Sequence, residues 1–233
     1  ESVITAFNTN IDALHFVRSG EVRKILGANS DLRKEVLRKL IAPPFEIEGI
    51  ADFLASLLHA MRLGCGMELT ICRKEIFDCL CSTFKIDGIR MGGQAGIMAN
   101  VLANLGVKNV HPHVSQLSSV QAELFVKSNS IKVPTFKEGK VILENPSRVF
   151  REKDEPLIHW VFEFSKGTRA KVDSTTIVSP NSNRLIATWD EFNSRLSIDS
   201  AFSVGTRRII KNVDKAMISG YQLLRRDYPD GTT

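Results

Sequence analysis

Three polar residues stand at alternate positions directly after the first apolar run of the chain. Asn8, Asn10 and Asp12 follow residues 3–7, an apolar run typical of a buried strand. In an extended chain alternate side chains share one face, so the two amides and the carboxylate are expected to converge. Together they can donate and accept several hydrogen bonds, which is what the hydroxyls of a sugar require. Asn and Asp also favour turns, so a plain turn after the strand remains the alternative.

A glycine-rich segment with the sequence RMGGQAG, residues 90–96, precedes an apolar stretch with helical character. Glycine lets a ligand approach the backbone, and free N–H groups at the start of a helix attract oxygen atoms. Gly92, Gly93 and Gln94 are therefore candidate binding residues. The chain contains neither the P-loop motif nor GxGxxG, so this segment predicts neither of those nucleotide sites. A role in packing alone explains the glycines as well.

A strand-like segment with the sequence IHWVFEF, residues 158–164, places His159 and Glu163 on one face. His159 could bind a hydroxyl or a phosphate, and a structural histidine is the alternative. Charged loop residues are usually solvated, but a substrate that carries phosphate needs a few of them. The cations that follow this strand are Lys166, Arg169, Lys171 and Arg184.

The composition limits the class of protein. The chain has 233 residues, of which 43% are hydrophobic and 24% charged, which excludes general disorder and collagen. No apolar run approaches the ~18–20 residues that a membrane-spanning helix needs, so we expect no membrane partner. The net charge of +5 comes from scattered Lys and Arg residues, so we expect no nucleic-acid partner either.

Four cysteines lie close together in the chain, at positions 65, 72, 79 and 81. Structural zinc sites usually pair their ligands as C-x₂₋₄-C, and this spacing does not. Cys65, Cys72 and Cys79 repeat every seven residues, so in a helix they would lie near one face as small buried thiols. A metal site and a disulfide remain alternatives. Reduced thiols and the absence of an export signal favour the cytoplasm.

Apolar periodicity predicts the elements that position these residues. The predicted helices are 32–41, 50–63, 97–105 and 198–213, and the predicted strands are 3–7, 107–110 and 216–220. Between residues 131 and 177 the period is mostly two, which indicates a sheet with polar loops. We therefore expect a layered α/β domain that carries an inserted β-rich domain.

Five segments together resemble a known family. They are NTNIDA at 8–13, GGQAG at 92–96, IHWVFEFSKG at 158–167, PNSNRLI at 180–186 and SGYQ at 219–222. In this order and spacing they resemble the archaeal ADP-dependent sugar kinases, the glucokinase and phosphofructokinase branch of the ribokinase-like superfamily. The resemblance implies a Rossmann-like α/β large domain, incomplete in this chain, with a small sheet-based lid. The large domain would comprise 1–11, 21–63, 92–140 and 191–233, and the lid 12–20, 64–91 and 141–190.

The resemblance also implies an activity, in which the β-phosphate of ADP passes to a sugar hydroxyl and AMP remains, with Mg²⁺ as cofactor. The residues that would bind the sugar are Asn8, Asn10, Asp12, Glu68, Gly92, Gly93, Gln94 and His159. Arg184 resembles a lid arginine that reaches the nucleotide phosphates, and Lys166, Arg169 and Lys171 are candidates for a sugar phosphate. Glu68 and His159 resemble glucokinases, whereas residues 180–182 look more like phosphofructokinases. A member that uses both glucose and fructose 6-phosphate would reconcile these signals.

One departure from the family pattern concerns catalysis. The catalytic base of the family is the aspartate of a GxGD motif, and no Gly-Asp pair occurs in this chain. The metal-associated NxxE and HxE motifs are also missing. We therefore interpret the chain as the N-terminal half of a longer kinase, with the base beyond Thr233, and expect it to be inactive alone. The alternatives are a non-catalytic sugar-binding fragment, one half of a split kinase whose C-terminal half is a partner, or an unrelated α/β protein.

Overall fold

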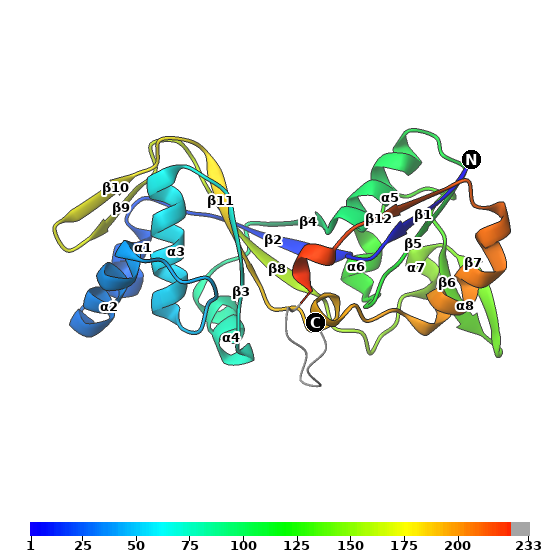
Figure 1. Cartoon of the computed structure of the whole chain (residues 1–233), viewed down its shortest axis with the longest axis horizontal. Helices are drawn as coiled ribbons and strands as arrows, with labels where there is room; N and C mark the ends of the chain where they lie inside the picture. Colours follow the sequence, from blue (N-terminus) through cyan, green and yellow to red (C-terminus); the bar gives the residue numbers. More distant parts are fainter. Residues whose placement is uncertain (225–233) are drawn as a thin grey trace. The chain divides into compact units, whose positions relative to one another are not determined.

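The computed structural model describes residues 1–224, which form two compact units (Figure 1). Unit 1 comprises Glu1–Asp12, Arg90–Ile158 and the described part of Asp190–Thr233. Unit 2 comprises Ala13–Ile89 and His159–Trp189. Each unit therefore gathers segments that are far apart in the chain.

Unit 1 is built on a parallel sheet of three strands in the order β12-β1-β5. These strands are β1 (Ser2–Ala6), β5 (Asn109–Pro112) and β12 (Lys215–Ile218). The central strand β1 is almost wholly buried because it has a neighbour on each side, whereas every residue of β12 is exposed. These strands confirm the three predicted from the apolar runs of the sequence.

Helices and a hairpin complete unit 1. They are α5 (Gln94–Asn104), α6 (Ser119–Glu123), α7 (Pro146–Val149), α8 (Ser200–Ile209), β6 (Val133–Lys137), β7 (Lys140–Glu144) and the 3₁₀ turns Asn193–Arg195, Ile210–Asn212 and Tyr221–Leu223. Helix α5 packs on β1 and β5, and α8 packs on the hairpin β6–β7 (Figure 1). A cluster around Ala99, Val110 and Phe125 forms the core between α5, β5 and α6. The predicted helices at 97–105 and 198–213 are thereby confirmed within a few residues.

Unit 2 contains a sheet of five strands in the order β3-β11-β8-β2-β4. Its strands are β2 (Asn10–Phe16), β3 (Met67–Thr70), β4 (Gly88–Gly92), β8 (Ile158–Phe164) and β11 (Asn183–Thr188). Strand β11 runs parallel to β3 and antiparallel to β8, and β9 (Arg169–Val172) and β10 (Thr175–Val178) form a separate hairpin. Strands β2 and β4 each have one end in unit 1, so they carry the chain between the units.

Four helices belong to unit 2: α1 (Glu21–Leu26), α2 (Ser30–Ile41), α3 (Ile50–Leu63) and α4 (Lys74–Thr83). Helix α3 has the predicted bounds, is buried along most of its length and packs against α2, β10 and β11. The side chain of Asn29 accepts the N–H of Leu32 and caps α2. Gly64, with a φ of 62°, ends α3 in the left-handed conformation that favours glycine.

The bounds of the two units differ from the expected domains in two segments. Residues 21–63 were expected in the large domain but lie in unit 2, because the apolar face of α3 covers β10 and β11. Residues 141–158 were expected in the lid but lie in unit 1, because β7 pairs with β6. Apolar periodicity predicts an element but not the sheet against which it packs.

The prediction for the cysteines was wrong in its placement. The segment 65–81 is not one helix: only Cys79 and Cys81 lie on α4, and both are exposed. Cys65 and Cys72 lie in loops and are half-buried. All four are free cysteines, and they are not the buried core thiols that the seven-residue repeat predicted.

In the part of the chain that the structure describes, no helix has the length and apolar character needed to cross a membrane.

Candidate functional site

Asn8, Asn10 and Asp12, called here the Asn–Asp cluster, lie where β1 ends and β2 begins, within unit 1. Asn10 Nδ2 donates to Asp12 Oδ1 at 3.1 Å, so the predicted convergence of these two residues is confirmed. Asn8 was expected on the same face, but β1 and β2 are separate strands with a break at residues 7–9. The alternation of one extended strand therefore does not extend back to Asn8.

Asn8 caps helix α5. Its Oδ1 accepts the N–H of Gln94 at 3.1 Å and the hydroxyl of Ser219 at 3.3 Å, and its backbone carbonyl accepts the N–H of Ala95 at 3.1 Å. The expectation that the first N–H groups of this helix would be free for a ligand is thus wrong for Gln94 and Ala95. An Asn outside the helix satisfies them instead.

Gly92 and Gly93 lie directly against the Asn–Asp cluster. A Cβ atom at Gly92 would overlap the carboxylate of Asp12 and the amide of Asn10. Gly93 has a φ of +72°, and a Cβ there would lie 2.7 Å from Asn10 Oδ1. These positions therefore require glycine so that the backbone at the start of α5 can approach the polar side chains.

The Asn–Asp cluster combines a buried amide with an accessible carboxylate. The side chain of Asp12 is 16% exposed, and Arg90 Nε lies 3.3 Å from its Oδ2. Asn10 is only 1% exposed, and its Oδ1 is buried without a hydrogen-bond partner among the described residues. The cluster therefore holds one accessible charged acceptor, the carboxylate of Asp12, next to a buried acceptor oxygen of Asn10 that no described residue uses.

Arg90 was not predicted as a site residue. It belongs to the glycine-rich segment, two residues before Gly92, but it lies 78 residues from Asp12 in the chain. Its position beside the glycines was the only sequence feature that indicated a place in the site.

A buried histidine supports the segment that leads into the Asn–Asp cluster. His113 Nδ1 donates to the carbonyl of Phe7 at 2.8 Å, and its Nε2 accepts the N–H of Asp199 at 3.1 Å. The backbone carbonyl of His113 also accepts the hydroxyl of Thr9 at 2.8 Å. Burial lowers the pKa of His113, which keeps the imidazole neutral. The hydrogen bonds at the two ring nitrogens set its tautomer. No motif in the sequence had indicated this role of His113.

Unit 2 carries the other residues predicted for the sugar and the nucleotide. Along β11, Ile186 pairs with Glu68 of β3, and Thr188 pairs with His159 of β8. Because paired residues share a face and alternate residues return to it, Glu68, His159 and Arg184 lie on the same face of the five-stranded sheet. Glu68 and Arg184 are exposed, whereas His159 is 3% exposed.

The predicted phosphate-binding cations are all exposed. Arg184 borders a small hollow of about 210 Å³ that Ser182 and Glu163 also line. Arg169 and Lys171 alternate with buried residues on the exposed face of β9. Lys166 lies in the turn after β8, where its N–H donates to Ser182 Oγ at 2.9 Å.

Among residues 1–224, no three His, Cys, Asp or Glu side chains are grouped so that they could hold a metal ion. The magnesium ion that the resemblance implies stays a prediction, since Mg²⁺ is usually held by only one or two carboxylates together with substrate phosphates.

Comparison with known proteins adds independent information. The whole chain, residues 1–233, matches the conserved region of ADP-specific phosphofructokinase/glucokinase. An ADP-specific phosphofructokinase of Thermococcus kodakarensis is 35% identical over 99% of this chain and 50% of its own length. An ADP-dependent glucose/glucosamine kinase of Pyrococcus furiosus is 34% identical over 97% of this chain and 48% of its own length.

A solved structure shows the same relation. An ADP-dependent kinase in complex with fructose-6-phosphate and ADPβS superposes with a TM-score of 0.76 at 34% identity. The match covers 100% of this chain and 44% of that one. The chain thus spans about half the length of the relatives that it matches, and it shares the ribokinase-like α/β fold of these kinases. It belongs to the ADP-specific phosphofructokinase/glucokinase family.

Proposed function

We propose that the chain is the sugar-binding half of an ADP-dependent kinase, which phosphorylates glucose, fructose 6-phosphate or both and releases AMP. Relatives of about twice its length are an ADP-specific phosphofructokinase and an ADP-dependent glucose/glucosamine kinase, which supports both sugars as substrates. In this proposal unit 1 is part of the large domain and unit 2 is the lid.

The buried Oδ1 of Asn10 is the observation that best supports a sugar at the Asn–Asp cluster. A buried polar atom without a partner costs about 1–3 kcal/mol, and a ligand hydroxyl that donates to it would recover this cost. Asp12 would accept a second hydroxyl as a charged acceptor. Gly92 and Gly93 would let the sugar lie against the backbone, next to Gln94, while Asn8 holds the start of α5 in place.

The residues of unit 2 would complete recognition. Glu68 and His159 would hydrogen-bond the hydroxyls of glucose, and Lys166, Arg169 or Lys171 would pair with the phosphate of fructose 6-phosphate. Arg184 would reach the phosphates of ADP, where a cation stabilises the charge that develops during phosphoryl transfer.

The catalytic base and the site for Mg²⁺ belong, in this proposal, to a second polypeptide segment or chain. Strand β12 is exposed at the edge of its sheet, and its residues Met217 and Ile218 line an apolar groove of about 500 Å³ together with Ile97 and Met98 of α5. The groove supports the packing of such a segment or chain against β12 and α5. The alternative, a non-catalytic sugar-binding protein, predicts the same binding without that layer. The four free cysteines support a reducing compartment such as the cytoplasm.

The test is binary sugar binding to the chain and its Asp12→Ala variant, measured by calorimetry with glucose and with fructose 6-phosphate. Loss of a hydrogen bond to a charged group should weaken the bound sugar by about ten- to a hundredfold. Asp31→Ala is the matched control, because the Asp31 carboxylate is 92% exposed at the start of α2. Equal affinities of the Asp12→Ala variant and the parent chain would refute the assignment of the sugar site.

A further inference from the structure

An arginine lies against the carboxylate to which a sugar would bind. Arg90 belongs to β4, and its Nε lies 3.3 Å from Oδ2 of Asp12. Both residues belong to unit 1. The side chain of Arg90 is 44% exposed and that of Asp12 is 16% exposed, so the ion pair lies at a surface that a ligand can reach.

Each oxygen of the Asp12 carboxylate has a different partner. Asn10 Nδ2 donates to Oδ1 at 3.1 Å, and the guanidinium of Arg90 lies at Oδ2. The backbone of Gly92 lies against the same carboxylate, because a Cβ atom there would overlap Oδ1. The carboxylate is thus held from three sides. Its two partners use about half of the acceptor sites of a carboxylate, so a sugar hydroxyl can still donate to it.

The ion pair also determines the net charge next to a bound sugar. A carboxylate alone would repel a phosphate ester, which carries about −1.5 to −2 charges at neutral pH. The phosphate of a hexose phosphate would lie within about 8 Å of a carboxylate that binds a hydroxyl of the same molecule. This distance is one Debye length in physiological salt, so the repulsion is only partly screened. Because Arg90 places a positive charge 3.3 Å from Asp12, the two charges largely cancel at the phosphate.

We propose that Arg90 is a specificity-determining residue, which allows the Asn–Asp cluster to bind a sugar that already carries a phosphate. It holds the carboxylate of Asp12 in place and offsets its charge. This inference rests on the proposed function, because it places a sugar at Asp12. Without Arg90 the site would favour neutral sugars over sugar phosphates.

The test uses the whole 233-residue chain, labelled with ¹⁵N and titrated with fructose and with fructose 6-phosphate, which differ only in the phosphate. Shifts of the backbone amides near Gly92 give both dissociation constants. Arg90→Met should weaken fructose about twofold, through the loss of one partly exposed ion pair, and fructose 6-phosphate about tenfold. Arg90→Lys keeps the charge and should restore most of the affinity for fructose 6-phosphate.

The dependence on salt is a readout that a structural defect would not change. The extra loss of fructose 6-phosphate affinity in Arg90→Met should shrink when the salt concentration is raised from about 50 to about 500 mM. Salt screens the repulsion between Asp12 and the phosphate, whereas it does not repair a distorted site.

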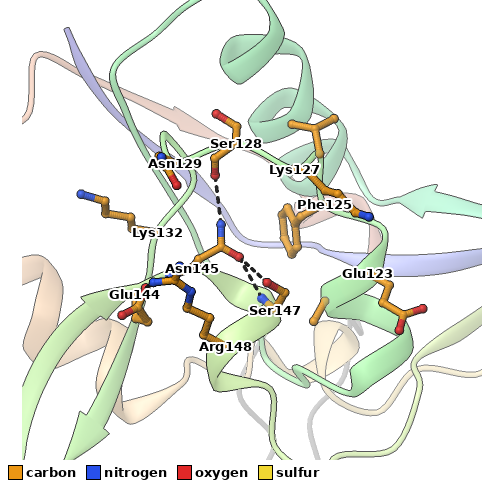
Figure 2. Close-up of a pocket in the computed structure, with 12 residues that line it drawn as sticks. Glu123, Phe125, Lys127, Ser128, Asn129, Lys132, Glu144, Asn145, Ser147 and Arg148 are labelled. Atoms are coloured by element: carbon orange, nitrogen blue, oxygen red, sulfur yellow. Dashed lines mark hydrogen bonds and ion pairs between the residues drawn. The ribbon is translucent and has the colours of Figure 1, made fainter.

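Arg148→Met is the matched control, because it breaks another ion pair between an arginine and a carboxylate in unit 1. Arg148 lies 3.7 Å from Glu144, and their side chains are 73% and 35% exposed. Both residues line a separate cavity of about 1030 Å³ that contains no residue of the Asn–Asp cluster (Figure 2). Both dissociation constants of this variant should equal those of the parent chain.

Asp12→Asn separates this inference from the proposed function. If the sugar binds at Asp12, this variant should weaken fructose about fivefold and fructose 6-phosphate less, because the repulsion is lost together with the charged acceptor. An unchanged affinity for fructose would overturn both the sugar site and the inference. If Asp12→Asn weakens fructose but Arg90→Met weakens both ligands equally, or Arg148→Met shifts them as much, the role of Arg90 alone is overturned.

Discussion

At the scale of single residues, the Asn–Asp cluster depends on two glycines as much as on its polar side chains. Asp12 and Asn10 occupy the space that a side chain at Gly92 would need, and Asn10 also lies against Gly93. Because Gly92 and Gly93 have no side chains, the backbone of this segment can lie against Asn10 and Asp12. Asn8 accepts the N–H groups of the next two residues, Gln94 and Ala95. A binding role and a packing role were the two alternative explanations of these glycines. In the structure the packing of the glycines is what positions the proposed binding residues.

Replacement of Gly92 by alanine should consequently damage the site. The new methyl group would force Asp12 and Asn10 apart, and overpacking of this kind costs about 1–3 kcal/mol of unfolding free energy. Sugar affinity should fall by about tenfold or more, since the hydrogen bond between Asn10 and Asp12 is broken. Urea denaturation and calorimetry measure the two effects.

Gly88→Ala on the same strand β4 is the control for this change. A Cβ at Gly88 meets only Leu14 Cδ1, at an ordinary 3.8 Å. Stability should change by less than about 1 kcal/mol and sugar affinity not at all. Equal effects of Gly88→Ala and Gly92→Ala would contradict the close approach described for Gly92.

Glu68 offers a test of substrate preference at the residue scale. If its exposed carboxylate accepts a hydroxyl of glucose, Glu68→Ala should weaken glucose by about tenfold and fructose 6-phosphate by less than about twofold. Glu75→Ala, on helix α4, is a comparable change elsewhere in unit 2. Losses of the same size for both sugars would remove Glu68 as the residue that selects glucose.

At the scale of secondary-structure elements, His113 joins three of them. It directly follows β5, its imidazole holds the end of β1 through Phe7, and it accepts an N–H from Asp199, the N-cap of α8. Rings of Phe7 and Phe202 pack edge-on against it at 5.6 and 4.9 Å. Protonation of Nε2 would remove the acceptor for Asp199 and place a charge among these rings.

The stability of the chain should therefore depend on pH through His113. Burial lowers its pKa in the folded state, so below about pH 6.5 the unfolded chain binds a proton that the folded chain resists. The free energy of unfolding should be constant above that pH and fall as the pH decreases from 6.5 to 5.5. Buried His111, whose pKa is also lowered, contributes in the same direction.

Urea denaturation between pH 7.5 and 5.5 measures this dependence, and the imidazole resonances in NMR give the pKa directly. His113→Gln should be less stable at pH 7.5 and lose less stability on acidification than the parent chain. A pKa of His113 at or above 6.5 would contradict the account of its burial.

Some of the secondary-structure elements could be predicted from the sequence, and others could not. Helix α3 was predicted with its observed bounds because its apolar stripe is long and ends at glycine. Strands β2, β3 and β4 were missed, since they are short or carry polar residues at buried positions such as Asn10. The contact of Asn10 with Asp12 followed from spacing, whereas Arg90 and His113 reach the site over 78 and 106 residues. No local pattern encodes such contacts.

At the scale of the whole molecule, the chain spans about half the length of the relatives that it matches, and the three-stranded sheet of unit 1 has an exposed edge strand, β12. A strand with free N–H and C=O groups and exposed apolar side chains is typical of a sheet that continues or pairs with another chain. The residues proposed for sugar binding lie within the chain, and those proposed for proton abstraction and metal binding do not. Binding and turnover should therefore be separable.

Assays of ADP-dependent AMP release by the 233-residue chain, with glucose and with fructose 6-phosphate in parallel, test this separation. We expect binding of sugar without AMP release, because no Gly-Asp pair of the kind expected for the catalytic base occurs in this chain and no three His, Cys, Asp or Glu side chains are grouped for a metal ion among residues 1–224. A second half from a relative, such as that of Thermococcus kodakarensis, should then be added, and release that appears only in the mixture would support a kinase completed by the missing half. Turnover by the chain alone would overturn this division, and the faster sugar would identify its substrate. Release that Asp12→Ala leaves unchanged would show that the reaction takes place outside the Asn–Asp cluster.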